Sequence, residues 1–126
     1  MKLTLYGVLS LSLTCIPVRG DTVRDLQDKV RAVPGFADLP CCGQCALARS
    51  ATCSPCWGET DAVTLSSCTT ASCLCDSLKR KRLTDYIRDK AEYLCKRGDT
   101  GTPVRATQIF EQFCAAVPTS APPAPV

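Results

Sequence analysis

The cysteines constrain this chain more than any other feature. Eleven occur in 126 residues, and ten of them lie between residues 41 and 114. The ten are Cys41, Cys42, Cys45, Cys53, Cys56, Cys68, Cys73, Cys75, Cys95 and Cys114. An even number of cysteines in a short extracellular chain is typical of a disulfide framework, because a chain of this length buries only a modest core. We therefore expect five disulfides, whose pairing the sequence leaves open.

The first 20 residues have the layout of a secretory signal peptide. Lys2 supplies a positive charge, an apolar run extends from Leu3 to Ile16, and small residues follow at Val18 and Gly20. The run is shorter than the roughly 20 apolar residues that a membrane-spanning helix needs. We predict cleavage after Gly20, which removes Cys15 and leaves a secreted, extracellular chain. A retained N-terminal anchor is the alternative interpretation.

Composition disfavours several classes of function. The chain carries 15 basic and 12 acidic residues, and the expected leader holds two of the basic ones, so the mature net charge is +1. Such a balance does not indicate nucleic-acid binding. The sequence has no histidine and no Gly-x-Ser-x-Gly motif, so the usual pairs of nucleophile and base are missing and we expect no enzymatic activity.

Two further interpretations concern metal and membrane. The C-x-x-C pairs Cys42/Cys45 and Cys53/Cys56 would also fit a zinc site, but an oxidising compartment and the lack of histidine favour disulfides. Residues 118–126 do not resemble the hydrophobic tail that precedes a glycolipid anchor. We therefore expect neither a transmembrane nor a glycolipid anchor.

The apolar spacing predicts an all-α, small disulfide-rich helical domain of four to five short helices over residues 21–117. We expect helices at 21–33, 41–52, 61–67, 76–94 and 102–117, and a loop at 67–72. The first should begin with Thr22 as N-cap. The long fourth should present Leu83, Ile87, Ala91 and Leu94 to the core, joined by Leu78 and Tyr86. The tail at 118–126 has four prolines in nine residues and is predicted to be extended and disordered.

The spacing of the cysteines resembles that of the fungal CFEM domain, an eight-cysteine extracellular module. The matching features are Leu39-Pro40-Cys41, Cys45, the Cys73-x-Cys75 pair, and the final Cys95 and Cys114. The chain departs from the family where Lys90 and Ala91 replace a sixth cysteine, and it carries the additional Cys42, Cys53 and Cys68. The resemblance covers about residues 39–115.

The resemblance implies haem binding, with an aspartate on the iron. Two alignments remain open. If Cys56 is the family's third cysteine, Thr60-Asp61 matches the Thr-Asp of the family, and Asp61 becomes a candidate haem-iron ligand. If Cys68 is the third, the family aspartate falls at Thr70 and is lost. Asp61 also fits a structural role, because an aspartate at a helix start caps the free backbone N–H groups.

Three classes of function therefore stay open. The first is a CFEM-like secreted protein that binds haem or iron, a cell-wall component or a host protein, as an effector would. The second is a lipid-transfer-like carrier of an apolar ligand, and the third is an interaction module without a small ligand. Trp57 is expected to pack on a disulfide, with a ligand platform as the alternative, and Lys79–Arg82 to form a solvated helix surface or a contact with anionic surfaces.

Overall fold

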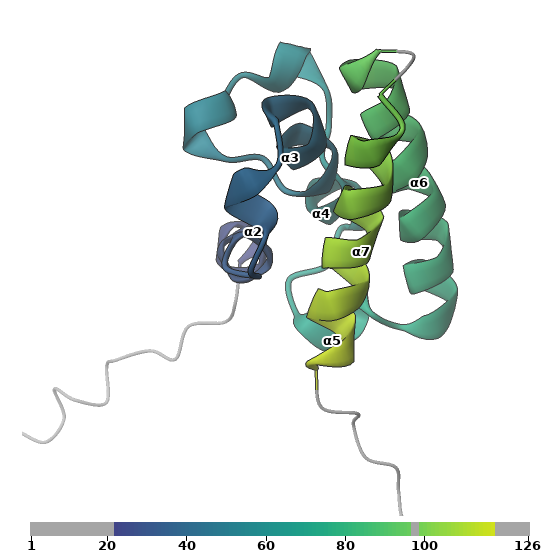
Figure 1. The fold of residues 1–126 in the computed structure, drawn as a ribbon. Coiled ribbons are helices and arrows are strands. Elements are labelled where there is room, and N and C mark those ends of the chain that lie inside the picture. The colour runs from purple at the N-terminus through teal and green to yellow at the C-terminus, as the bar shows by residue number, and fades with distance from the viewer. Residues whose placement is uncertain (1–21, 97–98, 118–126) are drawn as a thin grey trace, which may run out of the picture.

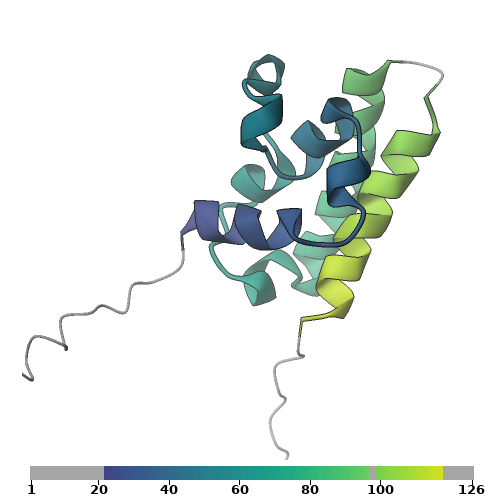
Figure 2. The same ribbon diagram turned by 60° about the vertical axis from the view of Figure 1, so that its left-hand side comes forward.

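Two antiparallel helices, α6 (Ser77–Cys95) and α7 (Gly101–Ala115), lie side by side and carry the rest of the fold (Figure 1). The computed structural model describes residues 22–96 and 99–117. The shorter elements pack against this pair from one side, and the two views of Figures 1 and 2 show α2, α3 and α4 together there. The arrangement is all-α, as the sequence predicts, and contains no strand within the described residues.

The shorter elements are four α-helices and three 3-10 turns in the described residues. The helices are α2 (Val23–Arg31), α3 (Cys41–Leu47), α4 (Ala62–Ser66) and α5 (Ala71–Leu74). The 3-10 turns are η2 (Phe36–Asp38), η3 (Ala51–Cys53) and η4 (Cys56–Gly58). The predicted helix at 41–52 ends earlier than expected, at Leu47, because Ala48 takes an extended conformation with φ of −154°.

Local capping explains where α2 and α5 begin. In α2, the Thr22 side chain accepts from the backbone N–H of Asp25, and the Asp25 carboxylate accepts from the N–H of Thr22, both at 3.0 Å. This confirms the expected N-cap. At α5, the Thr70 hydroxyl accepts from the N–H of Cys73 at 3.2 Å. Part of the expected loop at 67–72 is therefore a short helix.

The core lies where α6 and α7 face α2, α3 and α4. Its largest fully buried side chains include Phe110, Leu26, Leu47, Leu74 and Ile87. The expected core positions Leu83, Ile87 and Ala91 of α6 are buried, whereas the fourth, Leu94, is half-buried.

Leu78 was expected to join this face but is 66% exposed. It precedes Leu83 by five residues, which places it about 140° further round the helix and off the core face. The same offset separates Val104, which is 49% exposed, from the buried Ile109.

Five disulfides connect the ten expected cysteines. The pairs are Cys41–Cys53, Cys42–Cys95, Cys45–Cys56, Cys68–Cys73 and Cys75–Cys114. Two of these pairs tie α3 to the segment that follows it, and one ties α3 to the end of α6. The pair of Cys75 and Cys114 ties the end of α5 to the end of α7, and the pair of Cys68 and Cys73 joins α5 to the residues just before it. Both C-x-x-C pairs are split between different disulfides, so neither presents the free thiolates that zinc requires.

Two of the sequence-based expectations fall on residues that the structure does not describe. The signal peptide at 1–20 and the proline-rich tail at 118–126 lie outside the described residues, and both stay predictions. Within residues 22–96 and 99–117, no helix combines the length and apolarity needed to cross a membrane.

Candidate functional site

The most unusual surface residue is the one tryptophan of the chain. Trp57 lies in η4 and is 61% exposed, although a side chain of this size normally contributes to a core. The expected packing on the neighbouring disulfide stays a prediction, and at most a minor part of the side chain is covered. Its neighbour Cys56 is 1% exposed and forms the disulfide with Cys45.

The backbone around Trp57 adopts a conformation that side chains normally avoid. Cys56 has φ of 58°, Trp57 has φ of 54° and Gly58 has φ of 77°. Only glycine enters this left-handed region without cost, and a bulky residue held there costs about 1–3 kcal/mol. Such outliers persist only where the surrounding structure fixes them, and they cluster at functional sites.

The segment that carries Trp57 is fixed on both sides. The disulfides Cys41–Cys53 and Cys45–Cys56 join it to α3. The Arg49 guanidinium donates to the carbonyl oxygen of Pro55 at 3.3 Å, and the Glu59 N–H donates to that of Cys56 at 2.9 Å. The backbone that carries Trp57 is thus fixed before any ligand binds.

A second exposed aromatic residue lies at the same place. Tyr93, on the last turns of α6, is 71% exposed. Both rings border a surface pocket of about 550 Å³, which we call the Trp57 pocket. Its lining consists of Cys41, Cys42, Trp57, Glu59, Tyr93, Leu94 and Lys96.

Charged groups border the aromatic rings. Lys90 donates from Nζ to the Glu59 carboxylate, and its Nζ lies 5.7 Å from the centroid of the Tyr93 ring and 5.5 Å from that of Tyr86. The hydrogen bond to Glu59 raises the pKa of Lys90 above its usual value. Burial raises the pKa of Tyr86, whose hydroxyl donates to the carbonyl oxygen of Thr60.

Sequence reasoning singled out Trp57 but not Tyr93 or Glu59. A usable indication for Tyr93 exists in the helical spacing. Tyr93 follows the core residue Ile87 by six positions, which places it about 120° away from the buried face of α6. An aromatic residue off the core face of a predicted amphipathic helix is a candidate contact residue, since burial does not explain it.

Asp61, the candidate haem ligand, caps α4. It is 3% exposed, and its carboxylate accepts from the Thr64 hydroxyl at 2.7 Å, the Thr64 N–H at 3.4 Å and the Gln27 side-chain amide at 3.2 and 3.3 Å. The capping role is confirmed. Both carboxylate oxygens already accept hydrogen bonds, so iron ligation would have to displace these donors. The haem role stays a prediction.

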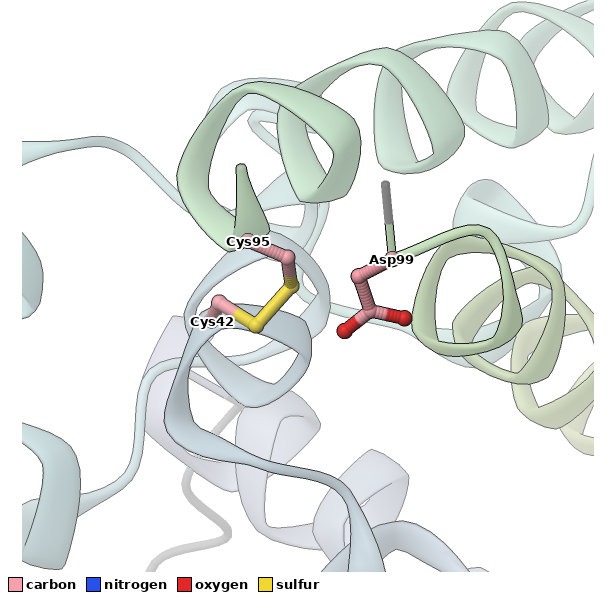
Figure 3. Close-up of side chains that lie close together, drawn as sticks. All are labelled: Cys42, Cys95 and Asp99. Carbon is pink, nitrogen blue, oxygen red and sulfur yellow. A yellow bond between two sulfur atoms is a disulfide. The ribbon is translucent and has the colours of Figure 1, made fainter. Parts of the chain in front are cut away.

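One group of potential metal ligands comprises Cys42, Cys95 and Asp99, which Figure 3 shows together. The two sulfur atoms are bonded to each other, so only the Asp99 carboxylate is available, and one carboxylate does not make a metal site. Asp99 instead accepts from the backbone N–H of Thr102 at 2.9 Å in the first turn of α7. This hydrogen bond is the main reason that the pKa of Asp99 is lowered.

The basic run at Lys79–Arg82 consists of two residues that contact neighbouring elements and two that are exposed. Lys79 donates to the carbonyl oxygen of Ser66 at 3.2 Å, and Arg80 pairs with Glu111 of α7 at 2.5 Å. These two residues are half-buried and connect α6 to its neighbours, while Lys81 and Arg82 are exposed. The run is therefore not one continuous charged patch.

A second pocket lies between α2, α5 and α7. It has a volume of about 500 Å³, and most of its lining is apolar. Its lining residues are Lys29, Ala32, Val33, Pro34, Ala71, Gln112, Phe113, Ala116 and Val117. Lys29 is the one charged residue among them. This pocket is the place where an apolar ligand would fit.

The chain matches no family model, no curated protein and no solved structure. The resemblance to the CFEM domain thus depends only on the pattern of cysteines and the few residues beside them, and it stays a prediction.

Proposed function

We propose that this chain is an extracellular binding protein whose contact site is the Trp57 pocket. The observation that carries the proposal is the conformation of Trp57. The ring is 61% exposed and contributes little to the core. Its backbone lies in the left-handed region, which glycine adopts at lower energy than tryptophan. The five disulfides and the predicted signal peptide support an extracellular location.

Preorganisation is what such a site gains from this architecture. Ordering a flexible aromatic side chain and its loop on binding costs about 0.5–1.5 kcal/mol per immobilised side chain. Here two disulfides and the hydrogen bond from Arg49 to Pro55 hold the segment in advance. Tryptophan and tyrosine are also the residues that most often dominate binding energy at interfaces.

The test separates a structural role from a binding role. Trp57→Gly suits φ of 54° and removes the ring, so we expect an unfolding free energy within about 1 kcal/mol of wild type. Leu78→Ala is the matched control, since Leu78 is 66% exposed at the other end of α6. A loss of more than about 2 kcal/mol in Trp57→Gly would show that the ring is structural and would overturn the proposal.

Binding is then measured with haem, palmitate, neutral hexasaccharides and an array of extracellular proteins. We expect at least one of these ligands to bind wild type and Leu78→Ala equally and to bind Trp57→Gly at least tenfold more weakly. If every ligand that binds does so equally well in Trp57→Gly, the proposal is wrong.

Two other functions are distinguished by the same panel. Haem binding through Asp61, which the CFEM resemblance implies, would be lost in Asp61→Ala and kept in Trp57→Gly. An apolar ligand such as palmitate would occupy the pocket between α2, α5 and α7 and pair its carboxylate with Lys29. Its binding would fall in Lys29→Glu and not in Trp57→Gly.

A further inference from the structure

We infer that the Trp57 pocket binds a neutral glycan, by stacking pyranose rings on Trp57 and Tyr93. The inference rests on the proposed function and names its ligand class. The faces of aromatic rings carry negative potential, which attracts the weakly positive C–H groups on the face of a sugar ring. Both side chains are largely exposed, at 61% and 71%, so their rings are accessible at the surface.

The polar groups of the pocket suit hydroxyl groups. Glu59 and Lys96 provide one carboxylate and one ammonium group in the lining. A sugar hydroxyl can donate to the carboxylate and accept from the ammonium group, and hydrogen bonds with one charged partner are the stronger kind. Lys90, which pairs with Glu59, and Asp99, whose carboxylate lies within 4.8 Å of the Cys42 sulfur, add one charge of each sign beside the lining. The charges at the pocket therefore balance, and we expect no selection for a charged ligand.

The size of the site favours a glycan over a protein partner. A volume of about 550 Å³ lies within the range of roughly 300–1,000 Å³ that small-ligand sites occupy. A stable protein interface needs about 800 Å² on each partner and an extended apolar centre. The other large exposed apolar side chains, Leu65, Leu78 and Val104, do not line this pocket, so they do not extend it into such a centre.

The rigidity of the site points the same way. Cys41 and Cys42 line the pocket, and their disulfides to Cys53 and Cys95 join the segment before Trp57 and the end of α6 to the same helix, α3. The two aromatic residues are therefore held on one cross-linked frame. Two aromatic residues on backbone positions fixed relative to each other suit a polymer whose sugar units repeat at a fixed distance.

The test is isothermal titration of the full mature chain with cellohexaose, chitohexaose and laminarihexaose, and with hexagalacturonate as the anionic probe. We expect at least one neutral hexasaccharide to bind, and to bind Trp57→Ala and Tyr93→Ala at least tenfold more weakly. Trp57→Phe, which keeps an aromatic face, should recover part of the affinity. Leu78→Ala should bind as wild type does.

The outcomes separate the inference from the proposed function. If no neutral saccharide binds, while haem or an extracellular protein binds in a manner that depends on Trp57, the glycan inference is wrong and the proposed function stands. Preference for hexagalacturonate would also overturn the inference, because it would show selection by charge. If nothing that binds depends on Trp57, both fail. Circular dichroism and the mass of the oxidised chain confirm that each variant is folded.

Discussion

Replacing Asp61 tests the structural and the haem interpretations of the same carboxylate. In Asp61→Ala, α4 loses its N-cap, which is worth about 0.5–2 kcal/mol. The carboxylate also accepts from the Thr64 hydroxyl at 2.7 Å and from the Gln27 amide at 3.2 Å, and hydrogen bonds to a charged group are worth about 1.5–3 kcal/mol. These contributions overlap, so we expect a total loss of about 2–3 kcal/mol.

The matched variant is Asp61→Asn, which keeps one oxygen for the Thr64 N–H and the Gln27 amide but places an NH2 group beside the Thr64 hydroxyl. We expect it to lose about 1 kcal/mol. Guanidinium unfolding of the oxidised protein, followed by circular dichroism, gives both values. A loss below 0.5 kcal/mol in Asp61→Ala, or equal losses in the two variants, would refute the capping argument as we state it.

The same two variants decide the haem prediction. If wild type binds haem through Asp61, both substitutions should abolish the Soret change on titration, because neither leaves a carboxylate for the iron. If haem binds both variants as it binds wild type, Asp61 is a cap and not a ligand.

Three further predictions follow from the packing, the disulfides and the titrating groups. Gly43→Ala places a Cβ atom 2.7 Å from the Thr102 methyl group and should destabilise the fold by about 1–3 kcal/mol. Thr102→Ser removes this methyl group and should relieve most of the loss in the double mutant. Losses of the two single mutants that simply add in the double mutant would contradict this prediction. Alkylation of the wild-type chain without reductant should add no label in mass spectrometry, and two labels per chain would contradict the pairing. Removing Cys42 and Cys95 together should lower the free energy of unfolding by about 4 kcal/mol, since this disulfide spans 53 positions. Burial raises the pKa of Tyr86, so the neutral phenol contributes fully to stability below pH 10, and this contribution is lost as the pH rises through the folded pKa. The ultraviolet difference titration between wild type and Tyr86→Phe should have its midpoint above 10.0. A midpoint at or below 10.0 would contradict this prediction.

The elements that the sequence predicts well are those with a local cause. The helices α2, α6 and α7 come from long amphipathic stretches, and the caps at Thr22 and Asp61 come from side chains that bond within three residues. The number of disulfides follows from the ten cysteines that lie outside the predicted leader. Each of these features depends on neighbours in the sequence or on composition alone.

The features that the sequence does not predict depend on tertiary structure. Pairing of Cys42 with Cys95 requires α3 to lie at the end of α6, which no local pattern encodes. The left-handed backbone at Trp57 is another such feature, since it lies next to the Cys45–Cys56 disulfide, whose pairing the sequence leaves open. The short helix α5 has little intrinsic propensity and is held by its Thr70 cap, the Cys68–Cys73 disulfide and the buried Leu74.

The central claim is that ligands contact Trp57, and acrylamide quenching of its fluorescence tests this most directly. The chain has one tryptophan, so the whole signal reports this site. In the free protein we expect efficient quenching, because the ring is 61% exposed. Saturation with the hexasaccharide that binds most tightly should lower the quenching constant at least twofold. Addition of hexagalacturonate should leave the quenching constant unchanged. Unaltered quenching in the presence of a bound saccharide would show that the ligand lies elsewhere and would contradict the account.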